Sequence, residues 1–493
     1  MADSVPATGF PAPVYSETVL NPHFEHAKKH FLPFLLQIHY AHTRMLARQG
    51  ILAPAEEQGL IAALDSLRVA LDEASIASWR RAGTCEDLFY FVEALLEQAC
   101  GRDLAGKMHT ARSRNDIAVT LYRMAARERL LEVLEAAAEL RAVLLRLTGE
   151  HLDTVMPAHT HMQPAQPTTL AHYLLASCEF LARDGERMQA AFGRLNSSPL
   201  GAAAITTSGF PIDREFTAQL LGFEGLAENS YGAIAAIDYL TETASAIAVA
   251  MVNLGKFNQD LLLWSTREFG FLRLPDGFVQ CSSIMPQKRN PVALEHTRIL
   301  ASRALGEAQA VLGCAHNTPF GDINDSEDDL QPLAMAMFAS ALRALKLLAG
   351  VIDAAEVDRA HLARRAARDF LTVTELADTL VRSEGLSFRE AHDLVAEAVR
   401  ACDSDDRAEA MAAALLAVRR SLRLSREEIL EALDPVHFVR IRKITGGPAP
   451  ERTREALAGA WEGQRRLEAW LTEKRRLVTS SRADASSASA QKP

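Results

Sequence analysis

Two segments of this chain, 116–152 and 232–264, run almost without glycine or proline and are rich in Ala, Leu, Glu and Arg. That composition favours helix over strand, and each segment greatly exceeds the average globular helix of about 11 residues. Helices this long bury enough apolar surface only when they lie side by side. The sequence therefore predicts a nearly all-α protein built around a bundle of long helices.

The second of these segments is apolar around most of its circumference. Its apolar positions recur at spacings of three and four residues, namely Ile234, Ile237, Leu240, Ala244, Ile247, Met251 and Leu254. A helix of this kind is buried by several neighbours. In a soluble chain we expect such a bundle to continue across subunit boundaries, which predicts a homo-oligomer.

Glycine and proline divide the chain into helical units. Loops are expected at 83–87, 156–167, 197–211, 274–291 and 316–329. We predict three helical domains: an N-terminal domain over 1–111 with 1–14 disordered, a central long-helix bundle over 112–365, and a small C-terminal domain over 366–478. The Ser- and Ala-rich stretch 479–493 is predicted to be a disordered tail.

The charge and cysteine content exclude several classes of function. Lys and Arg total 53 against 63 for Asp and Glu, so the net charge of −10 argues against a nucleic-acid partner. The six cysteines show no C-x-x-C spacing, which indicates neither a disulfide framework nor a zinc site. The N-terminus lacks a secretory pattern, and the thirteen uncharged residues between Glu242 and Lys256 are too few to span a bilayer. We predict a soluble cytoplasmic protein with no membrane partner.

Four separate segments carry groups that suit an anionic small molecule. The first, "HTARSRND" (109–116), places the polar residues Ser113–Asn115 at the start of a long helix, where free N–H groups and the helix dipole also favour an anion. The second, "HTHMQPAQP" (159–167), holds Thr160 and His161, and a histidine suits acid or base work near neutral pH. Taken alone, the first is a capped helix with surface arginines and the second an ordinary surface loop.

The other two segments are loops with unusual composition. "SSPLGAAAITTSGFPIDRE" (197–215) is a run of small residues that lets backbone approach a neighbour before a helix begins at Pro211. "CSSIMPQKRNP" (281–291) combines two hydroxyls, a thiol, a lysine, an arginine and an asparagine, and its prolines prevent one continuous helix. It is poorly suited to a core and well suited to surround an anion. Helix packing or a flexible surface loop would explain each alone, but four coincidences favour one shared site.

These residues resemble a known family. "CSSIMPQKRNP" differs by one residue from the G-S-S-x-M-P-x-K-x-N signature of the fumarase/aspartase superfamily. Within that superfamily the chain is most similar to the argininosuccinate lyase family, from about residue 50 to about residue 457. The segments that carry this similarity are "AGKMHTARSRND", "HTHMQPAQPTTLAH", "SPLGAAAITTSGFPIDREFTAQLLGF", "LLLWSTREFGFLRLPD" and "DFLTVTELADTLVRSEGLSFREAH".

The resemblance implies a fold, an assembly and a reaction. The fold would be all-α and fumarase/aspartase-like, with three helical domains whose central bundles assemble into a tetrameric core. The active sites would be composite, each built from three subunits of a homotetramer. The reaction would be the reversible elimination of fumarate from an N-substituted aspartate without metal or cofactor. In the family, argininosuccinate yields arginine and fumarate, a step of amino-acid biosynthesis.

The chemistry of that reaction explains the residue types. Removing a proton next to a carboxylate leaves a dianionic, nitronate-like species, so donors and positive charge must already surround that carboxylate. Lys288, Asn290 and Thr160 can supply them, and by similarity Ser282 is the base. A serine alkoxide is unfavourable in water, so Ser282 needs a closed loop rich in donors. We therefore predict that 281–291 is a mobile lid.

Further matched residues complete the predicted site. His161 matches the family histidine that assists protonation of the departing nitrogen, and Glu295 matches the carboxylate that orients it. The predicted substrate contacts also include Ser113, Arg114, Asn115, Gln163, Ser283, Asp322 and Glu327.

The chain departs from the family pattern at single positions in three segments. Cys281 replaces the glycine before the two serines, which stiffens the lid hinge or adds a weak thiol contact. Phe24 stands where a substrate-contacting serine is usual, and Phe89 replaces a histidine. The effect of Cys281 on lid motion is left open.

The strip "DINDSEDDL" (322–330) departs most strongly. Asp322 replaces a tyrosine, Glu327 a glutamine and Leu330 a lysine, where the family holds the arginine portion of its substrate. The local charge moves by about three units, which disfavours a free α-carboxylate on the amine half and favours a cationic or carboxylate-free amine. Alternatively, the strip has shifted outward and the changes are neutral. The amine partner, the physiological direction and the pathway are left open.

Two other functions compete with this interpretation. A different superfamily lyase, such as an adenylosuccinate lyase, is weakened by the "SRND" segment and by the lack of a nucleotide-binding feature. A catalytically silent protein that keeps the bundle would not need Ser282, Lys288, Asn290 and His161 together. His26 and His30 are spaced like a metal pair, but no third ligand has convincing spacing, so a solvated helix face or subunit contact is preferred and no metal is predicted.

Overall fold

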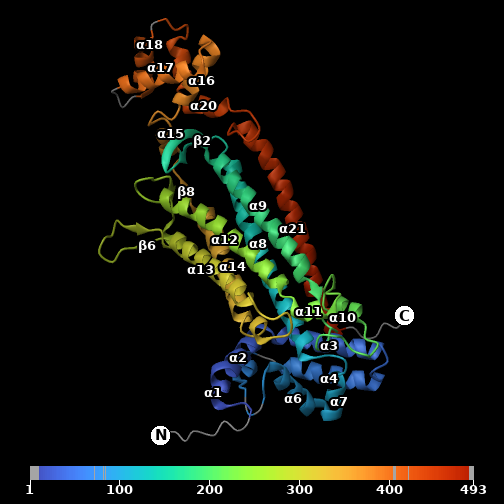
Figure 1. Ribbon diagram of the computed structural model, residues 1–493. Coiled ribbons are helices and arrows are strands. Elements are labelled where there is room, and N and C mark those ends of the chain that lie inside the picture. The colour runs from blue at the N-terminus through green and yellow to red at the C-terminus, as the bar shows by residue number, and fades with distance from the viewer. Residues whose placement is uncertain are drawn as a thin grey trace.

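The computed structural model describes residues 10–70, 73–81, 83, 85–402, 407–419 and 421–487. It is an elongated molecule in which long helices lie side by side, with the N-terminal helices at one end and a small helical unit at the other (Figure 1). The helical character predicted from the sequence is confirmed. The N-terminal end consists of α1 (Pro13–Tyr15), a π-helical turn (Ser16–Leu20), α2 (Asn21–His30), α3 (Leu32–Arg48), α4 (Pro54–Ala70), α5 (Glu73–Ser78), α6 (Leu88–Cys100) and α7 (Arg102–Met108).

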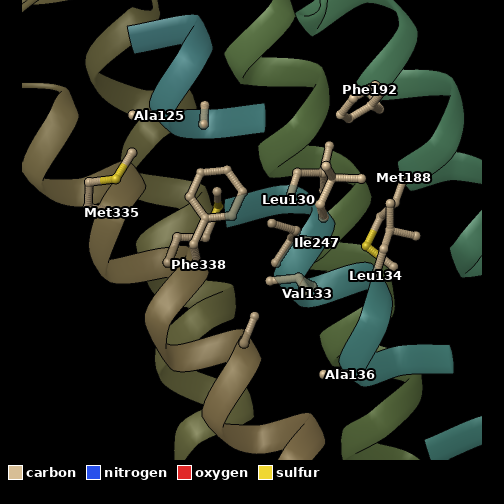
Figure 2. Close-up of a cluster of buried hydrophobic side chains, with 14 of the residues drawn as sticks. Ala125, Leu130, Val133, Leu134, Ala136, Met188, Phe192, Ile247, Met335 and Phe338 are labelled. Carbon is tan, nitrogen blue, oxygen red and sulfur yellow. The ribbon is translucent and has the colours of Figure 1, made fainter. Parts of the chain in front are cut away.

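The central bundle is organised around α8 (Arg114–Glu150), which matches the first predicted long helix within two residues at each end. Helices α9 (Leu170–Leu195) and α14 (Gln331–Ala354) pack against α8. The bundle is completed by α12 (Asp238–Trp264), which packs against α9, and by α13 (Val292–Ala315), which packs against α12 and α14. Figure 2 shows how these helices share one apolar core. The side chains labelled there are Ala125, Leu130, Val133, Leu134 and Ala136 of α8, Met188 and Phe192 of α9, Ile247 of α12, and Met335 and Phe338 of α14.

The second predicted long helix is shorter than expected. Residues 232–235 belong to a separate short helix, α11 (Ser230–Ala235), whose first turn is capped by the Asn229 side chain. The backbone at Ala236 is extended, with φ −86° and ψ 123°, and α12 begins only at Asp238. The apolar periodicity continues across this break, so it could not reveal the change of direction.

The segment Asn324–Ala354 is long enough and apolar enough by composition to cross a membrane. Of its most apolar window, 61% is buried inside the molecule. This segment contains α14, which packs against α8 and α13. Burial in the bundle core therefore accounts for its composition.

The predicted loop 156–167 is instead a β-hairpin. Strand β1 (Val155–Thr160) pairs antiparallel with β2 (Gln163–Thr169), with a bulge between Ala158 and His159. Three further pairs of two-residue strands tie loops together: β3 (Ser197–Ser198) with β4 (Gly225–Leu226), β5 (Leu272–Arg273) with β8 (Glu356–Val357), and β6 (Gln280–Cys281) with β7 (Arg289–Asn290). The remaining short elements are α10 (Arg214–Leu220) and the 3-10 turns Asp276–Phe278 and Asn324–Ser326.

The C-terminal part differs from the predicted domain division. The helices of the small unit are α15 (Arg359–Ala366), α16 (Val373–Glu384), α17 (Phe388–Ala401), α18 (Arg407–Val418), α19 (Arg426–Ala432) and α20 (Pro435–Arg440), and α16 to α19 enclose an apolar core of their own. The last helix, α21 (Pro450–Ser487), returns along α8 and α9, so residues 450–478 pack on the central bundle and not with the small unit (Figure 1).

The predicted terminal disorder is also corrected in part. Residues 479–487 continue α21 as helix beyond Val478, the last residue of this helix in the apolar core. Near the other terminus α1 begins at Pro13. Residues 1–9 and 488–493 lie outside the described residues. The predicted boundaries at 111 and 365 stay predictions.

Candidate active site

The segment ahead of α8 is fixed by hydrogen bonds. Ser113 caps the helix: its hydroxyl accepts from the N–H of Asn115 at 3.4 Å, and its own N–H donates to Asp116 Oδ1 at 2.9 Å. Asp116 is fully buried, and its Oδ2 accepts from the N–H groups of Gly201 at 2.9 Å and Ala203 at 3.0 Å. Burial raises the pKa of Asp116 to about 6, against the opposing effect of the three N–H donors. The first and third predicted segments are therefore joined through this carboxylate.

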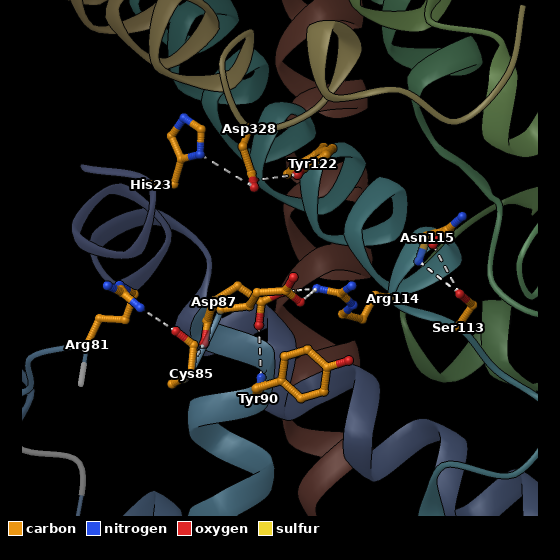
Figure 3. Close-up of polar contacts among 11 residues, drawn as sticks. His23, Arg81, Cys85, Asp87, Tyr90, Ser113, Arg114, Asn115, Tyr122 and Asp328 are labelled. Carbon is orange, nitrogen blue, oxygen red and sulfur yellow. Dashed lines mark hydrogen bonds and ion pairs between the residues drawn. The ribbon is translucent and has the colours of Figure 1, made fainter. Parts of the chain in front are cut away.

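Arg114 does not point to open solvent. Its guanidinium donates to Glu86 Oε2 at 2.7 Å and to Asp87 Oδ2 at 3.0 Å, and it lies 4.7 Å from the centre of the Tyr90 ring (Figure 3). Glu86 and Asp87 lie at the end of the predicted loop 83–87, shortly before Phe89. The predicted substrate contact is thus shared by two carboxylates of the same chain.

The strip around Asp322 lies against the start of α8. Asn115 Nδ2 donates to Asp322 Oδ2 at 2.7 Å, although the two residues are 207 positions apart, and also to Ala204 O at 3.2 Å. Glu327 shares a hydrogen bond with Asp322, and burial, followed by the Asp322 carboxylate, raises the pKa of Glu327 to about 9. Glu327 therefore keeps its proton to a higher pH than an ordinary glutamate. Asp322 and Glu327 therefore lie beside the start of α8.

Leu330 and the two phenylalanine departures lie in the apolar core. Leu330 is fully buried, Phe24 is 1% exposed with its ring 5.3 Å from that of Phe91, and Phe89 is 7% exposed. The changes at these positions therefore add apolar packing and do not supply polar groups to the site. Beside them, Tyr122 donates to Asp328 Oδ1 at 2.9 Å, and His23 lies 3.8 Å from the same carboxylate (Figure 3).

Glu86, Asp87, Tyr122, Asp328 and His23 were not in the predicted site. Glu86, Asp87 and Asp328 could have been predicted from the sequence. All three are acidic residues, and they lie in the predicted loop 83–87 or in the strip 322–330. His23 and Tyr122 lie within helices and carried no signal.

Thr160, His161 and Gln163 lie at the tip of the β1–β2 hairpin, and all three are exposed. The two-residue turn is His161–Met162, with φ values of 50° and 63°. Non-glycine residues in this left-handed region are strained by roughly 1 kcal/mol or more each, and such strain concentrates at functional sites. The turn thus places the imidazole at the exposed tip of the hairpin.

The hairpin and the Ser113–Asn115 segment lie at opposite ends of α8. With 37 residues, α8 is about 55 Å long. The hairpin follows directly on the C-terminal end of α8, whereas Ser113 caps its N-terminal end. Within one chain these two predicted parts of the site do not meet.

The segment 281–291 forms a loop closed at its base by β6 and β7, where Cys281 pairs with Arg289 and Gln280 with Asn290. Most of the loop is exposed, including Ser283 and Lys288, and Ile284 is 83% exposed. Ser282 Oγ accepts from the N–H groups of Ile284 at 3.4 Å and Met285 at 3.1 Å. Two N–H groups directed at one hydroxyl oxygen would stabilise that oxygen if it carried negative charge.

Glu295 is exposed in the first turn of α13. Among the residues that the structure describes, no hydrogen bond or ion pair joins Glu295 to His161, so this predicted pair is not assembled within a single chain.

The His26 and His30 rings lie 4.6 Å apart. Burial, followed by the neighbouring histidines and Lys29, lowers the pKa of His26 to about 4. No group of three or more His, Cys, Asp or Glu side chains that could hold a metal ion occurs in the described part of the chain.

Comparison with known proteins gives consistent matches over most of the chain. A family model described as "Lyase" matches residues 22–306, and one described as "Argininosuccinate lyase C-terminal" matches 370–440. "Argininosuccinate lyase 2" of Agrobacterium fabrum is 43% identical over 462 residues, covering 92% of this chain and 91% of the relative. "Argininosuccinate lyase" of Methanoculleus marisnigri is 40% identical, covering 89% and 88%.

Solved structures match as well. An EDDS lyase crystallised with formate superposes with a TM-score of 0.83 at 33% identity, covering 97% of this chain and 96% of that one. A 3-carboxy-cis,cis-muconate lactonizing enzyme from Pseudomonas putida, at 20% identity and a TM-score of 0.72, shares the fold.

Proposed function

The chain belongs to the argininosuccinate lyase family of the fumarase/aspartase superfamily and is a carbon–nitrogen lyase that releases fumarate, and from this premise we propose that its substrate is an N-substituted aspartate whose amine half is cationic. The proposal rests on the contact between Asn115 and Asp322, which places Asp322 and Glu327 beside the segment predicted to bind substrate. The family resemblance alone would favour argininosuccinate itself.

The charge around Asn115 supports a cationic amine. Arg114, the nearby guanidinium, is already shared by Glu86 and Asp87. A free carboxylate on the amine half would meet Asp322 with little positive charge to offset the repulsion, whereas an ammonium or guanidinium group would be attracted. Glu327 shares a hydrogen bond with Asp322, so both carboxyl groups lie where the amine half would bind.

We assign the chemical roles as the resemblance implies. Ser282 removes the proton next to the carboxylate that Lys288, Asn290, Thr160 and Ser283 hold, and the N–H groups of Ile284 and Met285 stabilise the serine oxygen when it is deprotonated. His161, oriented by Glu295, assists protonation of the departing nitrogen. Ser113, Asn115 and Gln163 position the remainder of the substrate.

These roles require an assembly, and we propose a homotetramer with composite sites. The length of α8 separates the Ser113–Asn115 segment from the hairpin, so another copy must bring a hairpin to each site. Apolar side chains exposed on a single chain mark helices that could pack between copies: Val249 at 40% and Val252 at 47% on α12, and Ile299 at 54% and Leu312 at 37% on α13. Light scattering should give four times the chain mass, and a monomer with full activity would contradict this proposal.

The amine is tested by running the reaction in the direction of addition. Purified protein is mixed with fumarate and either arginine or agmatine, which differ only by the α-carboxylate, and the loss of fumarate absorbance is followed. We expect agmatine to react faster than arginine. If arginine reacts faster, the amine proposal is wrong while the lyase assignment stands. If neither these nor simple diamines react, the chain is catalytically silent.

An Asp322→Asn variant sharpens the same test. Removing this charge should raise the ratio of the arginine rate to the agmatine rate about tenfold, which corresponds to about 1.4 kcal/mol. Asp325→Asn is the matched control, because Asp325 is an exposed carboxylate three residues along the same strip. An equal shift in both variants would indicate a general charge effect.

We also keep the cytoplasmic location and the absence of nucleic-acid and membrane partners as predictions. Cell fractionation checks them.

A further inference from the structure

A separate cavity of about 170 Å³ lies beneath the β1–β2 hairpin, between that hairpin and the helices α9 and α12. It is away from the start of α8 and from the acidic strip, which lie at the other end of the bundle (Figure 1). The residues that give it chemical character are His159 and Met162 of the hairpin, Tyr173 of α9, Asp260 and Trp264 of α12, and Phe269.

The walls of this cavity are aromatic. The Tyr173 and Trp264 rings lie 4.6 Å apart at an angle of 53°, and the Phe269 ring is 5.7 Å from that of His159. Met162 adds a polarizable thioether at the roof. Aromatic faces that converge on a small space attract organic cations through their π electrons.

Asp260 supplies the charge of the cavity. Its Oδ2 accepts a hydrogen bond from the Tyr173 hydroxyl at 2.6 Å, and among the described residues no hydrogen bond is made to its Oδ1. The nearby guanidinium of Arg365 is paired with Asp369 at 3.3 Å. Burial lowers the pKa of His159 from its ordinary value, and the Asp260 carboxylate opposes this shift.

From the cavity, its three aromatic rings and the Asp260 carboxylate, we propose a second binding site for a small organic ammonium ion beneath the hairpin. A dry cavity of about 150 Å³ accommodates benzene, so this one suits a ligand of about six non-hydrogen atoms. The ammonium group contacts Asp260 Oδ1 and the aromatic faces, and its alkyl part contacts Met162 and Leu263.

The position of the site gives it a regulatory consequence. Met162 follows His161 directly in the strained turn, so a ligand packed against Met162 changes the freedom of the His161 imidazole. Amines of this class are also what the reaction releases. This consequence rests on the proposed role of His161 in catalysis, whereas binding of the ligand does not.

The test uses n-butylammonium as the probe and 1-butanol as its uncharged counterpart, with binding to the full-length protein measured by calorimetry. We expect saturable binding of n-butylammonium, at least tenfold weaker binding in Asp260→Asn, and unchanged affinity in the exposed control Asp325→Asn. The asparagine keeps an acceptor for the Tyr173 hydroxyl. Met162→Ala provides a second variant at an exposed position, with affinity expected to fall about threefold.

Three outcomes would overturn the proposal. They are no saturable binding, equal binding of 1-butanol, or a loss of binding in Asp322→Asn while Asp260→Asn binds as well as the parent. The last result would place the ammonium in the catalytic pocket. Because binding is measured without turnover, an inactive protein that binds n-butylammonium through Asp260 would refute the proposed function and leave this inference intact.

Discussion

The two ends of α8 are built in opposite ways. At the N-terminal end, Asp116 is fully buried and ties the helix start to Gly201 and Ala203, while Asn115 reaches Asp322. At the C-terminal end, His161 is exposed on a strained two-residue turn. The 281–291 loop resembles the hairpin in this respect, since the hydrogen bonds that Ser282 Oγ makes with described residues come from N–H groups of its own loop.

The difference separates recognition from reaction. Groups that position a substrate gain from being fixed in advance, because ordering them during binding would cost affinity. Groups that move protons need to close around the substrate and exclude water, so they lie on segments that can move or that come from another copy. A substitution that removes a hydrogen-bond partner at the fixed end should therefore lower stability, and one on the exposed loops should lower the rate with little change in stability.

The largest expected effect comes from a substitution in the exposed loop 281–291. Ser282→Ala should lower kcat by about 1,000-fold or more, because it removes the proposed base, while the melting temperature stays within about 1 °C. Steady-state kinetics and thermal unfolding measure the two quantities. The control is Ser283→Ala, whose hydroxyl is next in the same loop and should cost less than about tenfold. Equal losses in both variants would remove Ser282 as the base.

The fixed end should give the largest loss of stability. The two carboxylate oxygens of Asp116 accept hydrogen bonds from three backbone N–H groups, and Asp116→Asn replaces one of these oxygens with an NH2 group, which can only donate. Each buried N–H left unpaired costs about 1–3 kcal/mol. We expect the free energy of unfolding to fall by about 2–4 kcal/mol in chemical denaturation. Asp213→Asn is the matched control, because Asp213 caps α10 and asparagine caps equally well. A stable Asp116→Asn protein would show that this end is less rigid than its contacts indicate.

Glu327 should make the fixed end sensitive to alkaline pH. Its pKa is raised from 4.5 to about 9, so its stabilising contribution is fully present below pH 4.5 and is lost as the pH rises through 9. Glutamine resembles the protonated form, so Glu327→Gln should gain stability relative to the parent between pH 5 and pH 9, by about 2 kcal/mol. Melting temperatures across this range measure the change. Asp325→Asn should show no such trend, and a pH-independent difference for Glu327→Gln would contradict the raised pKa of Glu327.

The smallest expected effect concerns the base of the loop. Cys281 pairs with Arg289 in the β6–β7 ladder, and its backbone does not need the freedom of glycine. Cys281→Gly should therefore change kcat by less than about threefold and leave the melting temperature unchanged. Kinetics at several viscosities would show whether opening of the loop limits turnover. A tenfold gain in kcat would mean that Cys281 restrains the lid.

Much of the fold could be predicted from the sequence because its signals are local. Residues 116–148 contain no glycine or proline, and Ser113 caps the helix. These two features predicted both ends of α8 to within two residues. The hairpin at 155–169 was missed because its prolines and short strands are typical of loops, and only pairing with each other makes these strands regular. The return of α21 along the bundle was missed for the same kind of reason, since its apolar positions do not say which helix covers them.

The candidate site divides in the same way. The motif in 281–291 identified the residues that carry the proposed chemistry, and the strip 322–330 identified where the chain departs from its family. The partners of these residues were hidden: the pairing of Arg114 with Glu86 and Asp87 joins segments 27 and 28 positions apart, with no periodicity to connect them.

The sequence by itself determined the helical class, the family and the set of polar residues available for catalysis, because helix periodicity and motifs act over a few neighbouring positions. The tertiary structure decided which of those residues meet. In the folded chain Asn115 donates a hydrogen bond to Asp322, and Leu330 is buried in the core. The hairpin lies about 55 Å from the start of α8, which is the length of that helix. Such contacts depend on the path of the whole chain, which no local pattern of residues encodes.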